Sequence, residues 1–145
     1  MDWKRAAMDD LRRYPFQKQS LENISTRVSA LKQKFTTVKG TLSDATPVQG
    51  GASRIEDRML DNIVERERLI LTYRATKRLV DLVESGLAGL DDRERLVLER
   101  FFITRERAHV ERLMEELHVE KTKVYSMKDQ ALYKFTICMY GLIDY

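Results

Sequence analysis

Residues that break helices are scarce in this chain, and half of them lie in one short stretch. The sequence "GTLSDATPVQGGAS", residues 40–53, holds three of the six glycines and one of the two prolines. Residues 54–85 contain neither, and they are rich in Glu, Arg and Leu. Because Gly and Pro are the residues least compatible with a helix interior, this pattern predicts long helices on both sides of a linker at 40–53.

Apolar residues recur at helical spacing on both sides of this linker. Pro15 interrupts the first helical pattern and suits the first turn of a new helix. Neither long segment can bury its apolar stripe alone, so the economical solution is a long antiparallel helical hairpin. Pairing between chains is the competing solution and leaves a homodimer open. The stripes are Trp3, Ala7, Leu11 and Tyr14, then Leu21, Ile24, Val28, Leu31, Phe35 and Val38, and then Ile55, Met59, Ile63, Leu69, Tyr73, Thr76, Val80, Val83 and Leu87.

The pattern changes at Gly86 and Gly89, where a domain boundary is expected. Asp91 followed by Glu94 is typical of a capping box at a helix start. The sequence therefore predicts an N-terminal helical domain, 1–89, for oligomerisation or partner binding, and a C-terminal domain, 90–145. Three short helices are expected in the second domain, at 92–103, 106–118 and 121–140. The fold class is all-α.

The three C-terminal helices have apolar faces that can close one core. A four-residue turn, "HVEK", separates the second and third helices, and Val119 within it can fill the core between them. Two helices joined in this way predict a helix-turn-helix. The expected core residues are Leu96, Val97, Phe101 and Phe102, then Val110, Leu113, Met114 and Leu117, and then Val124, Met127, Ala131, Leu132 and Phe135.

The other side of the last helix is polar and basic. Residues 121–135 hold four lysines and one aspartate, whereas the segment before them is rich in glutamate. Lysines can neutralise phosphates, and hydroxyl side chains can contact base edges in a groove of double-stranded DNA. The ordinary alternative is a charged helix that only faces water. The predicted DNA-binding residues are Lys121, Thr122, Lys123, Tyr125, Ser126 and Lys128.

The sequence gives little support for a metal site, a cofactor site or an enzyme active site. His109 and His118 have no cysteine partners, so no metal site is expected, and no cofactor or enzyme motif is present. Cys138 lies in an apolar segment, which predicts a buried structural thiol. Trp3, Tyr14 and Phe16 are expected in the core. Apolar runs stop well short of the ~20 residues of a membrane span, and no signal peptide is recognisable, so we expect a cytoplasmic protein.

The stretches "LDDRERLVLERFF" and "VERLMEELHVEKTKVYSMKDQALYKF" resemble region 4 of bacterial sigma-70 factors. The resemblance implies a helix-turn-helix in which DNA contacts come from Lys121, Thr122, Tyr125 and Ser126. Three positions depart from the family pattern: Met114 replaces a small residue, His118 replaces the turn glycine, and Glu120 replaces a capping Ser or Thr. The usual arginines and glutamine that contact bases are absent.

The whole layout is similar to that of the RinA/ArpU-type phage late-transcription regulators, with "LRRYPFQKQSLENISTRVSAL" and "PVQGG" as further points of likeness. This resemblance implies a phage or prophage protein that binds a promoter and acts with host RNA polymerase. Two alternatives remain: a small-terminase-like packaging subunit, and a helical module that binds only proteins. The sequence leaves the operator, the oligomeric state, the polymerase contact, and activation or repression undetermined.

Overall fold

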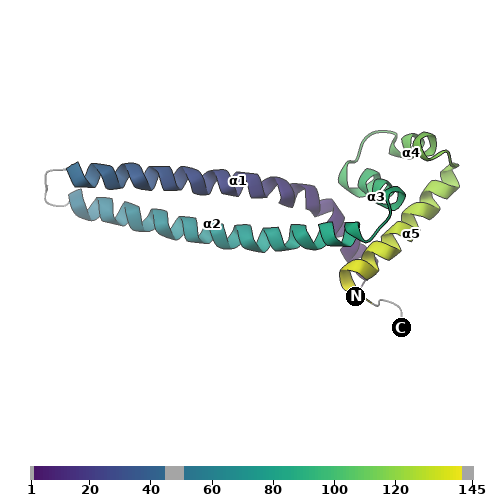
Figure 1. Ribbon diagram of the computed structural model, residues 1–145, viewed down its shortest axis with the longest axis horizontal. Coiled ribbons are helices and arrows are strands. Elements are labelled where there is room, and N and C mark those ends of the chain that lie inside the picture. The colour runs from purple at the N-terminus through teal and green to yellow at the C-terminus, as the bar shows by residue number, and fades with distance from the viewer. Residues whose placement is uncertain (1, 45–50, 142–145) are drawn as a thin grey trace. The chain divides into compact units, whose positions relative to one another are not determined.

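The computed structural model describes the backbone of residues 2–44 and 51–141 and the side chains of 2–40 and 54–141. These residues form helices and no strands, so the all-α prediction is confirmed. In order the elements are α1 (Trp3–Asp44), α2 (Gly51–Ala88), α3 (Asp92–Leu98), a π-helical segment η1 (Glu99–Ile103), α4 (His109–Leu117) and α5 (Lys121–Tyr140). Figure 1 labels the α-helices. No helix in this described part is long and apolar enough to cross a membrane.

The chain divides into two compact units. Unit 1 contains residues 1–17 and 78–145, and unit 2 contains residues 18–77. The predicted C-terminal domain, 90–145, therefore packs together with the first turns of α1 and the last turns of α2. Periodicity alone does not reveal this pairing, because it shows which side of a helix is apolar but not which distant helix covers it.

Unit 2 consists of the parts of α1 and α2 that lie side by side. The amide of Asn62 donates a hydrogen bond of 2.8 Å to the carbonyl of Leu31, and Arg27 lies 3.7 Å from Glu65. Residue numbers rise along α1 as they fall along α2, so the two helices are antiparallel (Figure 1). The predicted α1 stripe from Leu21 to Val38 is half-buried at all six positions.

Two details of the long helices correct the sequence prediction. Pro15 lies inside α1 and does not begin a new helix. Interior proline costs about 3 kcal/mol, and packing of the flanking turns outweighs that cost. The linker predicted at 40–53 is too long, because α1 extends to Asp44 and α2 begins at Gly51. Residues 45–50 of that linker lie outside the described residues.

The core of unit 1 is built around the ring of Phe135. Ala7 and Leu11 of α1 have no exposed surface and pack in one cluster with Val83 of α2 and Phe135 of α5. The other buried members of this first cluster are Leu90, Leu98, Phe102, Ala131 and Leu132. The first turns of α1 are thus part of the same core as α3 and α5.

Polar contacts also hold the start of α1 within unit 1. The Tyr14 hydroxyl donates to Glu84 at 2.9 Å, and the Tyr140 hydroxyl donates to Asp10. Burial, and then this bond to Asp10, raises the pKa of Tyr140 to about 12. The ring centres of Trp3 and Tyr140 lie 5.0 Å apart, so the start of α1 is in contact with the end of α5.

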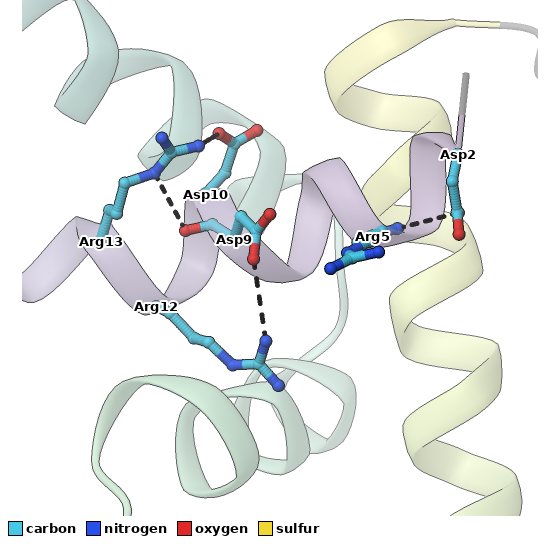
Figure 2. Close-up of polar contacts among 6 residues, drawn as sticks. All are labelled: Asp2, Arg5, Asp9, Asp10, Arg12 and Arg13. Carbon is cyan, nitrogen blue, oxygen red and sulfur yellow. Dashed lines mark hydrogen bonds and ion pairs between the residues drawn. The ribbon is translucent and has the colours of Figure 1, made fainter.

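Acidic and basic side chains in these first turns also pair with one another within α1. Figure 2 shows Asp2 capping the helix start, where its carboxylate accepts from the Arg5 backbone at 3.0 Å. Arg12 lies 3.7 Å from Asp9, and Arg13 lies 3.3 Å from Asp10. Exposed pairs of this kind are worth about 0–1 kcal/mol each. The buried apolar side chains therefore contribute more to holding the first turns of α1 in unit 1.

Two side chains, one aromatic and one containing sulfur, are not buried as the sequence predicts. Phe16, expected in the core, is 78% exposed, whereas Trp3 and Tyr14 are half-buried. Cys138, expected to be a buried thiol, is exposed. Both lie on helices whose apolar side is already filled by other residues. Phe16 therefore faces outward, whereas Cys138 lies at the edge of the unit with its sulfur close to Gly89.

The predicted capping box at the start of α3 is confirmed. The Glu94 backbone donates to the Asp91 carboxylate at 2.8 Å, and the Asp91 backbone donates to Glu94 at 3.2 Å. The bond from the Glu94 backbone holds the pKa of Asp91 below its usual value. Glu94 also accepts from Lys134 at 2.8 Å, which raises the pKa of Lys134 and ties α5 to α3.

We expect Gly86→Ala to destabilise unit 1. A methyl group at Gly86 would lie 2.9 Å from the Phe135 ring and 3.0 Å from the Met139 sulfur. Overpacking costs about 1–3 kcal/mol, and the gain in helix propensity returns about 1 kcal/mol, so a net loss of about 1 kcal/mol is expected in urea unfolding. Gly40→Ala is the control, since a methyl group there meets nothing within 4 Å. A neutral or stabilising Gly86→Ala variant would contradict the packing described here.

We expect Tyr140→Phe to lower stability in a pH-dependent way. Its raised pKa means that the folded state prefers the neutral phenol, so this stabilisation is present below pH 10 and is lost as pH rises towards about 12. At pH 8 the variant should lose about 1 kcal/mol of unfolding free energy, because the bond to Asp10 is absent. The difference from the parent should shrink between pH 10 and 12. A difference that stays constant from pH 8 to pH 12 would contradict this role of the Tyr140 phenol.

Candidate nucleic-acid interface

The second apolar cluster of unit 1 joins α4 and α5. Its buried members are Val97, Val110, Leu113, Leu117 and Val124, and Leu96, Phe101, Met114, Val119 and Met127 pack against it. These residues belong to the core that the sequence predicts for the last three helices. Val119, in the turn, fills the position between the two helices that its place in the sequence suggests.

A tight turn with a left-handed residue connects α4 to α5. His118 has φ 54° and ψ 48°, and its N–H and that of Val119 both donate to the Met114 carbonyl. These two bonds end α4 in an arrangement that usually has a glycine at this position. His118 therefore occupies a backbone position that favours glycine, which is the role that the sequence resemblance assigns to it.

The start of α5 presents backbone N–H groups that no side chain caps. Glu120 is the N-cap residue in an extended conformation, and within the described residues its side chain makes no capping hydrogen bond. The first helical bond runs from Val124 to the Glu120 carbonyl at 3.1 Å. Free N–H groups and the helix dipole favour anions at such an end.

Five of the six predicted DNA-binding residues have exposed side chains. They are Lys121, Thr122, Lys123, Tyr125 and Ser126. Within the part of the chain that the structure describes, no ion pair is formed by Lys121 or Lys123. An open hollow of about 510 Å³ lies beside the turn, lined by His118, Val119, Glu120, Thr122, Lys123 and Ser126. The structure thus brings the two free amines and the two hydroxyls to one end of α5.

Lys128, the sixth predicted residue, has a different position. Its side chain is 25% exposed, and its amine lies 3.5 Å from Asp129. The same amine lies 5.4 Å from the ring centres of both Phe101 and Tyr125. A cation held over two rings is partly satisfied already, so Lys128 is better placed to position Tyr125 than to meet a phosphate.

The ring of Tyr125 packs against Phe101, which also packs on the core as the sequence predicts. Phe101 lies edge-on to Tyr125 at 5.8 Å and edge-on to His109 at 4.7 Å, measured between ring centres. The sequence predicts a core position for Phe101 but does not predict its contact with His109. Phe101 packs against both apolar clusters of unit 1, and its ring also reaches Tyr125 at the surface.

Two other basic residues of unit 1, Arg93 and Arg100, bind groups within the unit. Arg93 donates to the Leu117 carbonyl at 3.4 Å, and Arg100 pairs with Glu116 at 3.1 Å. Both bonds link the α3–η1 segment to α4. Net positive charge at the outward side of α5 therefore rests mainly on Lys121 and Lys123.

Among the described residues no group of three His, Cys, Asp or Glu side chains could hold a metal ion. Comparisons with protein families, with curated proteins and with solved structures found no match for this chain.

We expect His118→Gly to stabilise unit 1. A side chain in the left-handed region costs about 1–2 kcal/mol, and the greater freedom of glycine in the unfolded chain takes back about half of the gain, so an increase of about 0.5–1 kcal/mol is expected in urea unfolding. Glu115→Gly, at an exposed position inside α4, is the control and should destabilise by about 1 kcal/mol. A loss of stability in His118→Gly would show that the imidazole itself makes a stabilising contact.

Proposed function

We propose that this chain is a DNA-binding transcription regulator of phage or prophage origin, in which α4, the turn and α5 act as a helix-turn-helix. The proposal rests on the contrast between the buried side of α5 and the exposed residues at its start. Val124, Ala131 and Phe135 are fully buried, whereas Lys121, Thr122 and Ser126 at its start are exposed. A helix that enters the major groove uses residues at its N-terminal end in this way.

The residues at this end divide the work of binding between affinity and specificity. Lys121 and Lys123 lie where they can neutralise phosphates, which supplies most of the affinity and makes it dependent on salt. The uncapped N–H groups of α5 add a second contact for a phosphate. Thr122 and Ser126 can donate to or accept from base edges, and Tyr125 is held in one orientation by Phe101 and Lys128.

The proposed phage origin and the action with RNA polymerase rest on the sequence resemblance. A protein of the RinA/ArpU type would bind a promoter and act on late genes with host RNA polymerase. In such a protein the helices of unit 2 are free to pair with a second copy or to contact the polymerase. A homodimer is part of this proposal, since a dimer doubles the DNA contacts made at two half-sites.

We expect Lys121→Ala combined with Lys123→Ala to weaken DNA binding and to reduce its salt dependence. Two lost phosphate contacts should lower the slope of log K against log salt by about 1.8. The thermal midpoint should stay unchanged, because both side chains are exposed and make no ion pair in the described part of the chain. Fluorescence anisotropy over several salt concentrations measures the slope, on the site that footprinting finds in the DNA flanking the gene.

Lys32→Ala combined with Lys34→Ala is the matched control. It removes two exposed lysines at the same spacing from α1 and should leave the slope near that of the parent. Equal losses in both double variants would point to general charge attraction and would contradict the assignment to α5. Absence of any DNA binding by the parent would favour a module that binds only proteins.

A further inference from the structure

Helix α2 carries apolar side chains on two opposite sides within unit 2. One side faces α1 and includes Leu69, which is 8% exposed. The other side holds Leu60, Val64 and Leu71, which are 59%, 55% and 65% exposed. With 3.6 residues per turn, these three positions fall within about 40° of one another and lie opposite Leu69. Ala75 extends this stripe, which we call the outer stripe of α2.

Helix α1 has no such second stripe. Its large apolar residues within 18–40 all belong to the half-buried side that faces α2, and none of the described ones there is strongly exposed. Two antiparallel helices that only pair with each other need one apolar side each. The outer stripe of α2 is therefore more than the pairing with α1 requires, and apolar stripes of this kind mark interaction surfaces.

Charge along the same part of α2 is separated by sign. Residues 56–67 hold five acidic and two basic side chains, a net charge of −3. Residues 68–77 hold three basic side chains, Arg68, Arg74 and Lys77, and no acidic one, a net charge of +3. The change of sign falls between Glu67 and Arg68. An antiparallel copy of this segment would place each half beside the half of opposite charge, whereas a parallel copy would place like charges together.

The outer stripe has its centre at the same place. Val64 and Leu71 are equally distant from the point between Glu67 and Arg68, and so are Leu60 and Ala75. A twofold axis at that point would bring Val64 against the partner's Leu71 and bring Leu60 against the partner's Ala75. A surface that pairs with itself in this way is the requirement for an isologous dimer.

We propose that the outer stripe of α2 is the docking site for a second copy of this chain, and that the two α2 helices pack antiparallel about the point between residues 67 and 68. This inference deepens the proposed function by naming the surface and direction of its dimer. It does not depend on DNA, so its test contains none, and its failure would leave the assignment of the α5 residues unaffected.

Sedimentation equilibrium of the full chain at micromolar concentration tests the surface. We expect a mass twice that of the 17.1 kDa chain. Leu60→Gln combined with Leu71→Gln should give a monomer with unchanged helix content by circular dichroism. Phe16→Gln, which removes an exposed apolar side chain from α1, is the control and should remain dimeric. A monomeric parent, a ring of many copies, or a dimer that survives the double substitution would overturn the proposal.

Cysteine cross-linking tests the direction, in a Cys138→Ser background that removes the exposed native thiol. A disulfide needs Cα atoms within about 7 Å of each other. Mixing a Val64→Cys chain with a Leu71→Cys chain should give a covalent dimer on mild oxidation, because antiparallel packing brings these positions together. Val64→Cys alone should stay uncrosslinked. Strong linking of Val64→Cys to itself, with no link between a Val64→Cys chain and a Leu71→Cys chain in the mixture, would indicate parallel packing and would overturn the arrangement.

Discussion

Burial of the first turns of α1 against Phe135 is the interaction on which unit 1 depends. Ala7 and Leu11 have no exposed surface and complete a core to which α2, α3, η1 and α5 also contribute. A fully buried leucine is worth about 1.5–3 kcal/mol, comparable with the whole contribution of several exposed ion pairs. The face of α5 that packs on this core fixes which face is left for other contacts. The exposure of Lys121 and Thr122 thus follows from packing that begins more than a hundred residues earlier in the chain.

Periodicity and local chemistry predict the elements well where neighbours in sequence decide the outcome. Residues 121–140 were predicted as the last helix, and α5 has these bounds. The Asp91–Glu94 capping box forms as predicted, because both partners lie within one turn. In contrast, the place of Pro15 within α1 and the exposure of Cys138 and Phe16 depend on which side of a helix distant residues fill. That information is not contained in any short window of sequence.

The same distinction applies to the candidate interface. Helical spacing was sufficient to place Lys121, Thr122 and Ser126 on one exposed end. It could not separate Lys128 from the other lysines, because that requires knowing that Phe101 of η1 lies beside Tyr125 and Lys128. It could not identify Arg100 as a partner of Glu116 either. Formal charge in the sequence thus overstates the charge that the surface offers to a phosphate backbone, since part of it is already neutralised within the fold.

Helix α2 shows how one helix can meet two requirements along a single stretch. Its inner side pairs with α1, and this pairing leaves one polar atom without a hydrogen bond. The side-chain N–H of Asn62 donates to the Leu31 carbonyl, whereas the side-chain oxygen of Asn62 is buried without a partner. A buried polar group of this kind costs stability but restricts the register in which two helices can pack. Its outer side, led by Leu60 and Leu71, has apolar character without any such polar restriction. In the proposed dimer, the register of that side comes from charge, through the change of sign between Glu67 and Arg68.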